Sequence, residues 1–189
     1  TMLVGDRVGA EIVYNNSTND LFVRFNPGLA EVGDEIILAG TARTITTFVF
    51  QYWGVDFSGN EQAQIRFYAN DGAAAPAGPT ILMPDSVLFD SGLFDIGPTP
   101  RSTLIFTDFI TGAATPLTTA LPDSFTWSVQ FYGTTDGAEA YGVDLYSPPT
   151  VGGNYLEYWD NGSGWQYSSL TIDGTNGPAN FAALIDAVP

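Results

Sequence analysis

Hydrophobic and polar residues alternate along much of this chain with a period of two, the pattern of β-strands that bury one face. In residues 62–69, Ala63, Ile65 and Phe67 alternate with polar positions. Residues 125–132 repeat the pattern, with large apolar residues at every second position. We therefore expect both segments to be strands with one face on a core and the other in water.

Residues 44–57 are apolar on both faces, which predicts a central strand covered on both sides. Turn signals such as Asn70-Asp71-Gly72 and Asp160-Asn161-Gly162 separate further apolar segments, and capped stretches of helical period are missing. Many short strands at near-regular spacing predict an all-β fold, a jelly-roll-like antiparallel β-sandwich. The additional strands are expected at residues 20–25, 34–39, 86–96, 101–109, 140–147, 154–159, 164–171 and 180–188.

The N-terminal residues have a different character from the rest. Two strand-like stretches, residues 2–4 and 10–14, precede the polar run 15–19. They predict either the first edge strand of the sandwich or an arm that pairs with another subunit's sheet. We divide the chain into an arm of residues 1–19, a candidate donor strand, and a single sandwich domain of residues 20–189. The apolar anchors of the arm would be Met2, Val4, Val8, Ile12 and Tyr14.

The composition excludes several classes of function. The 189 residues contain no histidine, cysteine or lysine, and 5 arginines face 21 acidic residues, for a net charge of −16. Catalysis by a Ser-His-Asp triad, a Cys-His pair or a Schiff base is therefore unavailable. Nucleic acid and anionic membrane surfaces are poor partners for so acidic a chain. No apolar run is long enough to insert the mature chain into a membrane.

Carboxylates are the main chemistry that this composition leaves. A pair of them can hydrolyse glycosides, but the acidic residues nearest one another in sequence lie beside turn signals, as solvated loop residues do. Calcium is the cofactor that a carboxylate-rich sandwich can bind through its loops, and no other cofactor is expected. The candidate calcium ligands are Asp136, Glu139 and Asp144.

Aromatic residues cluster around a predicted hairpin at residues 160–164. At the tip of a hairpin they would stack on sugar rings or fill a partner's pocket. In the alternative interpretation, Trp159 and Trp165 face the core as a cross-strand pair. The candidate contact residues for a glycan or partner are Tyr155, Tyr158, Trp159, Trp165 and Tyr167.

Four stretches together resemble secreted bacterial proteins of the PEP-CTERM class. They are Glu31–Thr41 (EVGDEIILAGT), Phe67–Gly72 (FYANDG), Leu121–Trp127 (LPDSFTW) and Gly142–Gly152 (GVDLYSPPTVG). Ectodomains of that class run into Val-Pro-Glu-Pro, and Ala187-Val188-Pro189 stops where Glu-Pro would begin. The resemblance implies an exported Gram-negative protein that is associated with exopolysaccharide at the cell surface, and it supplies no catalytic residues.

The sequence therefore predicts an extracellular, non-enzymatic structural protein that assembles with itself. In the first interpretation, strand exchange through residues 1–19 joins copies head to tail into a filament. In the alternative, the sandwich is a lectin-like domain that binds polysaccharide of the extracellular matrix. A glycosidase with a carboxylate pair is the third possibility.

Overall fold

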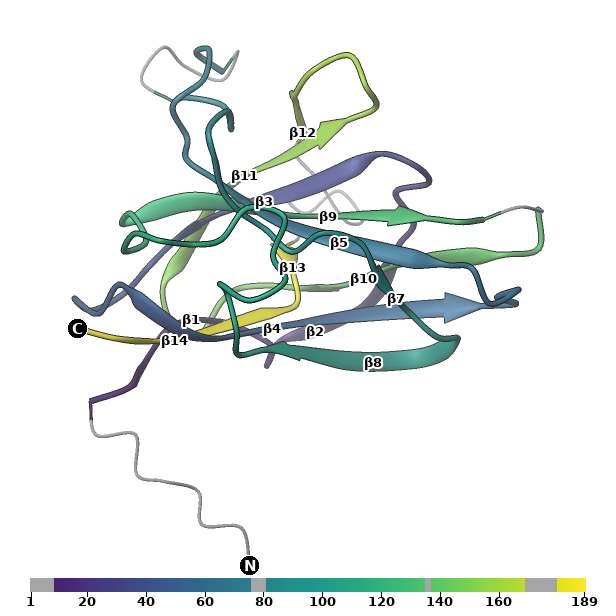
Figure 1. Cartoon of the computed structure of the whole chain (residues 1–189), viewed down its shortest axis with the longest axis horizontal. Coiled ribbons are helices and arrows are strands. Elements are labelled where there is room, and N and C mark those ends of the chain that lie inside the picture. Colours follow the sequence, from purple (N-terminus) through teal and green to yellow (C-terminus); the bar gives the residue numbers. More distant parts are fainter. Residues whose placement is uncertain (1–8, 76–80, 135–136, 169–179) are drawn as a thin grey trace, which may run out of the picture.

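The protein is a sandwich of two antiparallel β-sheets, which form two layers in a computed structural model (Figure 1). The structure describes residues 9–75, 81–134, 137–168 and 180–189. Within these ranges it forms fourteen strands and no helix, which confirms the all-β sandwich predicted from the alternation. None of the described residues belongs to a helix able to span a membrane.

Sheet A is built around the long strand β4, as the apolar run 44–57 predicts. β8 pairs with one edge of β4, while β14 and β10 pair with the other edge. β1 lies beyond β14, and β2 lies beyond β10, which also pairs with β13. The strands are β1 (Glu11–Asn16), β2 (Asp20–Phe25), β4 (Thr44–Val55), β8 (Thr99–Phe106), β10 (Ala140–Tyr146), β13 (Asn180–Phe181) and β14 (Ala183–Val188).

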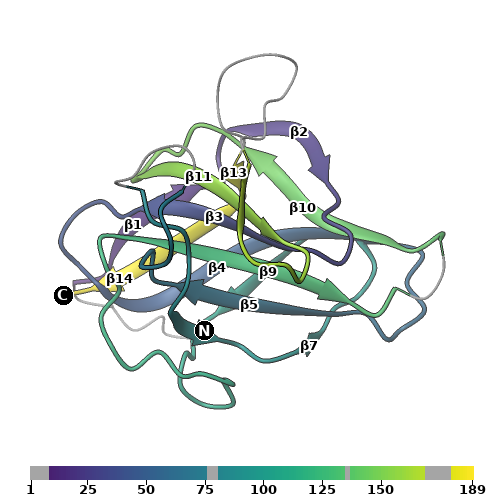
Figure 2. The same ribbon diagram turned by 90° about the horizontal axis from the view of Figure 1, so that it is seen from above.

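Sheet B has the order β12-β11-β3-β9-β5-β6, and β7 also pairs with β5. Seen from above, it lies over sheet A with β9 and β5 near its centre (Figure 2). The strands are β3 (Glu31–Ile37), β5 (Gln62–Tyr68), β6 (Val87–Asp90), β7 (Phe94–Asp95), β9 (Ser124–Tyr132), β11 (Gly153–Asp160) and β12 (Gln166–Ser168).

Aromatic rings fill the space between the sheets. Phe48 of β4 meets Phe67 of β5 and Trp127 of β9 edge-on, with centroid distances of 5.1 and 5.2 Å. All three side chains are fully buried. Such edge-to-face pairs add about 0.5–1.5 kcal/mol each to the free energy gained by burial. The inward residues of the two alternating segments thus form the core that their pattern predicts.

Two predicted strands are each broken into two. The expected strand 86–96 is divided into β6 and β7, because Gly92 adopts a left-handed φ of 70° that an extended strand excludes. The expected strand 180–188 is divided into β13, which pairs with β10, and β14, which pairs with β4 and β1. The segment expected at 164–171 forms a strand over Gln166–Ser168.

The outward face of sheet B differs from the expectation that it lies in water. Thr126 and Ser128 are fully buried, and Tyr68 is nearly so. Trp165, between β11 and β12, packs on Tyr68, and Asn70 in the loop after β5 accepts a hydrogen bond from Thr126 Oγ1 (2.7 Å). Tyr68 and Ser128 both donate to Glu31. Alternation identified which residues point outward, but it could not show that other segments cover them.

Strand β1 is part of the chain's own sheet A. Its inner edge pairs with β14, and on its other edge Val13 accepts a hydrogen bond from Ala39 N (2.8 Å) while Asn15 N donates to Val151 O (3.0 Å). Of the predicted arm anchors, Tyr14 is fully buried in this chain's core and Ile12 is 45% exposed. Met2, Val4 and Val8 lie outside the described residues. Exchange of this strand between copies stays a prediction.

Candidate functional site

The outward residues of sheet B form a layer of hydrogen-bonded polar groups around Glu31. Its carboxylate accepts hydrogen bonds from Tyr68 Oη (2.9 Å) and Ser128 Oγ, and it pairs with the Arg66 guanidinium at 2.7 Å. Arg66 also bonds Asp90 at 3.1 Å. Burial, followed by the negative charge of Glu31, raises the pKa of Tyr68 far above its ordinary value. The charges of Glu31 and Arg66 are therefore paired within this layer.

The β11–β12 hairpin places aromatic rings over this layer. Trp165 lies edge-on to Tyr68 and Tyr158, with centroid distances of 5.3 and 6.4 Å. Tyr167, the cross-strand partner of Tyr158, is 37% exposed, and Tyr155 is 46% exposed. Tyr155 lies on β11 with the covered Tyr158, and Tyr167 lies on β12, so sheet B presents aromatic surface to solvent along β11 and β12.

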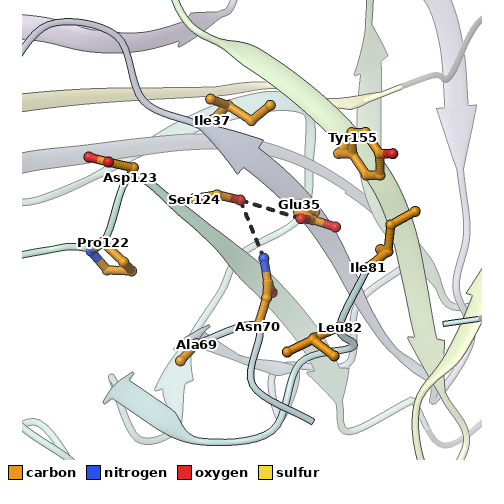
Figure 3. Close-up of a pocket in the computed structure, with 10 residues that line it drawn as sticks. All are labelled: Glu35, Ile37, Ala69, Asn70, Ile81, Leu82, Pro122, Asp123, Ser124 and Tyr155. Atoms are coloured by element: carbon orange, nitrogen blue, oxygen red, sulfur yellow. Dashed lines mark hydrogen bonds between the residues drawn. The ribbon is translucent and has the colours of Figure 1, made fainter. Parts of the chain in front are cut away.

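A cavity of about 580 Å³ opens on this face beside Tyr155. Its wall comes from β3, β9 and β11 and from the loops after β5 and before β9 (Figure 3). Tyr155 and Ile81 lie on one side of the cavity, Pro122 and Asp123 on the other, and polar groups between them. The ten lining residues are Glu35, Ile37, Ala69, Asn70, Ile81, Leu82, Pro122, Asp123, Ser124 and Tyr155.

The polar groups of the cavity are connected in a chain. Asn70 Nδ2 donates to Ser124 Oγ at 3.4 Å, and Ser124 Oγ donates to Glu35 at 3.3 Å. Tyr158 Oη donates to the other oxygen of Glu35 at 3.0 Å. Burial raises the pKa of Glu35, and the bonds from Tyr158 and Ser124 oppose that rise. The cavity thus combines apolar walls, an exposed ring and a few fixed polar groups, which is the composition of small-molecule sites.

The structure separates the five aromatic residues that the sequence grouped together. Tyr155, Tyr158, Trp165 and Tyr167 belong to the outward side of sheet B, whereas Trp159 packs against the core. The predicted core pairing of Trp159 with Trp165 is therefore not formed. Tyr155 lines the cavity, while Tyr158 reaches it through its hydrogen bond to Glu35.

The predicted calcium ligands do not form a site in the described residues. Asp144 is buried on the outward face of sheet A and pairs with Arg101 (3.3 Å) and Arg24 (3.8 Å), which supply the positive charge that a metal would bring. Glu139 is buried, and Asp136 lies outside the described residues. No three acidic side chains gather as metal ligands in the described part of the chain.

Sequence reasoning missed Glu35, Asn70, Asp123 and Ser124 as cavity residues. The available signal was their position, because Ser124 begins an alternating strand and Asn70 belongs to a turn that directly follows another. Neighbouring strands of one sheet bring such positions together, but the strand order that does so is not visible in the pattern.

Comparison with known proteins does not extend this description: no family model, curated protein or solved structure matches the chain. The similarity to PEP-CTERM proteins rests on the four stretches of sequence alone.

Proposed function

We propose that this domain is a non-enzymatic, lectin-like module that binds neutral polysaccharide in an extracellular matrix, at the cavity on sheet B. The observation that carries the proposal is the exposed ring of Tyr155 beside the fixed polar groups of Glu35, Asn70 and Ser124. Aromatic faces stack on the apolar faces of sugar rings, while carboxylates and amides bond their hydroxyls. The resemblance to PEP-CTERM proteins supports location at a bacterial cell surface.

The charge of the site favours a neutral sugar. Glu35 and Asp123 both line the cavity, and the chain has a net charge of −16. Arg43 pairs with Asp123 at 2.8 Å, so Asp123 already neutralises its positive charge. An anionic polysaccharide would be repelled from such a surface. We therefore expect hexose polymers without carboxylate or sulfate groups to bind best.

A glycan array followed by calorimetry with the strongest neutral oligosaccharide tests the proposal. Tyr155→Ala should raise Kd at least about tenfold, because truncating an aromatic anchor of a binding site costs about 2 kcal/mol. Tyr155→Phe is the matched control, since it retains the ring and should bind within about threefold of the wild type. Equal binding by Tyr155→Ala and the wild type would contradict the proposal.

The same oligosaccharide distinguishes binding from hydrolysis. A prolonged incubation should release no new reducing ends, because Glu35 is held by two hydrogen bonds and Asp123 is occupied by Arg43. Release that depends on Glu35 would identify the domain as a glycosidase.

Self-assembly is the second candidate function, and a different observation favours it. Strand β8 pairs along one side with β4, and no backbone bond joins its other side to any described residue. Ile105 on this eight-residue edge is 64% exposed. An open edge of this length accepts a strand from another chain. For residues 1–19 of a second copy to be the donor that extends sheet A and joins copies head to tail, β1 of that copy would have to leave its own sheet.

Light scattering and negative-stain imaging of the purified chain test assembly. We expect filaments that Ile105→Lys disrupts, because a charge on an edge strand opposes strand addition. Ile110→Lys is the control: Ile110 is 55% exposed but lies outside β8. A monodisperse monomer, or filaments that both variants form equally, would contradict assembly through this edge.

A further inference from the structure

Four polar side chains lie between the two sheets, at positions where a sandwich normally carries apolar residues. They come from β1 of sheet A and from β3 and β11 of sheet B. All are at most 2% exposed. This inner cluster consists of Tyr14 and Asn16 on β1, Asp34 on β3 and Glu157 on β11.

Two carboxyl groups of the inner cluster are direct neighbours. Asp34 and Glu157 are cross-strand partners on β3 and β11, so their Cβ atoms are about 4.5–5.5 Å apart. Burial, with the charge of Glu157 added to it, raises the pKa of Asp34 well above its ordinary value. The described arginines pair elsewhere, with Asp20, Glu31, Asp90, Asp123 and Asp144.

The backbone of Phe181 brings the Asn16 side-chain amide close to the Asp34 carboxylate. Phe181 N donates to Asp34 Oδ2 at 3.3 Å, and Phe181 O accepts from Asn16 Nδ2 at 3.1 Å. The N–H and C=O of one residue in an extended strand point to the same side. The Asn16 amide and the Asp34 carboxylate therefore approach Phe181 from one side.

Several oxygens of this cluster have no hydrogen-bond partner in the described structure. They are Asp34 Oδ1, Asn16 Oδ1 and the Tyr14 hydroxyl, all on side chains that are fully buried. The pKa of the Tyr14 phenol is raised, mainly by burial and secondly by the negative charge of Asp34. Asp34 and the Tyr14 hydroxyl are therefore close to each other. Buried oxygens of this kind are rarely left without a partner, because each costs about 1–3 kcal/mol.

We propose that the inner cluster binds one calcium ion between the two sheets. Two carboxylates and the amide oxygen of Asn16 are hard ligands of the kind that calcium prefers, and calcium tolerates the irregular geometry of ligands from three strands. The ion would supply the positive charge that Asp34 does not receive from the described arginines. Because β1 belongs to sheet A while β3 and β11 belong to sheet B, bound calcium would hold the sheets together.

Calorimetry and thermal unfolding of the full chain test the site. After treatment with a chelator, the protein is titrated with CaCl₂ at pH 7.5 and constant ionic strength. We expect one ion per chain, and at about 100 times Kd a rise in Tm of about 5 °C or more. Asp34→Asn should weaken binding at least about tenfold. Asp186→Asn is the control, since it removes the same charge from β14 between the inward residues Ile185 and Ala187.

The wild-type measurement is decisive even if Asp34→Asn does not fold. Absence of binding heat together with an unchanged Tm would overturn the proposal. Equal calcium affinity of the wild type and a folded Asp34→Asn variant would also overturn it, because the ion would then lie at the acidic surface. MgCl₂ raising Tm as much as CaCl₂ at the same concentration would overturn the assignment to calcium.

Discussion

The indole of Trp165 lies edge-on to the phenol ring of Tyr68, with 5.3 Å between the ring centroids. This contact joins the loop between β11 and β12 to β5, although β3 and β9 separate these strands in sheet B. It closes the polar layer around Glu31 from above and leaves Tyr155 and Tyr167 exposed beside it. The same contact thus stabilises the fold and shapes the surface where we propose that glycans bind.

Trp165→Ala should lower the free energy of unfolding by about 1–3 kcal/mol, because it removes a large partly buried ring and its two edge-to-face contacts. Trp165→Phe should lose less than half of that, since a smaller ring still covers Tyr68. Urea denaturation at neutral pH measures both values. A loss below about 0.5 kcal/mol for the alanine variant would mean that the hairpin is not held by this contact.

Arg66→Met should destabilise the protein by about 2–4 kcal/mol, because it leaves Glu31 and Asp90 without their shared cation. The Arg66 side chain is only 17% exposed, so water replaces little of the lost interaction. Asp123→Asn is a matched control. It breaks the pair with Arg43, but the Asp123 side chain is 86% exposed, and the loss should stay below about 1 kcal/mol. Equal losses in urea denaturation would contradict the proposed difference.

Glu61 should make stability fall in acid. Burial opposes ionisation of this carboxyl, but bonds from Ser58 N (2.7 Å) and Gly59 N (2.8 Å) outweigh it and lower the pKa to about 2. A lowered pKa stabilises the folded state above the ordinary value of 4.5, and this contribution is lost as the pH falls toward 2. The difference in urea midpoint between the wild type and Glu61→Gln should therefore shrink over this range. A difference that stays constant from pH 5 to about pH 2 would refute this account.

Asp34 should have the opposite effect when a chelator is present. Its pKa is raised above 3.8, so the folded state holds the proton more tightly than the unfolded state does. That contribution is present below pH 3.8 and is lost as the pH rises through the folded pKa, with a slope of at most about 1.4 kcal/mol per pH unit. Asp34→Asn, which resembles the neutral acid, should therefore become more stable than the wild type as the pH rises.

Calcium should make the wild type more stable than Asp34→Asn, the reverse of the order expected in chelator. This reversal is an internal control for the Asp34 prediction. In CaCl₂ at pH 7.5 the wild type gains stability that Asp34→Asn does not gain. Chemical denaturation of both chains in chelator and in CaCl₂ measures the four values together. If Asp34→Asn is less stable than the wild type in chelator at pH 7.5, the prediction that the ionised Asp34 carboxylate destabilises the folded state is wrong.

The period of two was sufficient to predict the faces of several strands. Ile65 and Phe67 on β5, with Phe125 and Trp127 on β9, point into the core as their alternation requires. The pattern also marked β4 as central, because both of its faces are apolar. It failed at β3, where Asp34 occupies an inward position between Val32 and Ile36. A carboxylate at an inward position carries no local signal, since its burial depends on a partner strand distant in the chain.

The candidate site was predictable only in part for a similar reason. Tyr155 was identified because aromatic residues gather near a hairpin, which is local information. Glu35 was not, since its role depends on Ser124 and Tyr158, which come from the two strands beside β3. Strand pairing sets these contacts, and a sequence pattern of period two is compatible with many strand orders.

The sequence by itself determined the all-β class, the composition of the core and the absence of histidine, cysteine and lysine chemistry, because alternation and composition are properties of the chain alone. The tertiary structure decided which polar residues meet. It buried the outward layer around Glu31, moved Trp165 away from Trp159, paired Asp144 with arginines, and brought Asp34 and Glu157 together between the sheets. Each outcome depends on contacts between strands far apart in sequence, and the pairing of strands is a property of the folded chain.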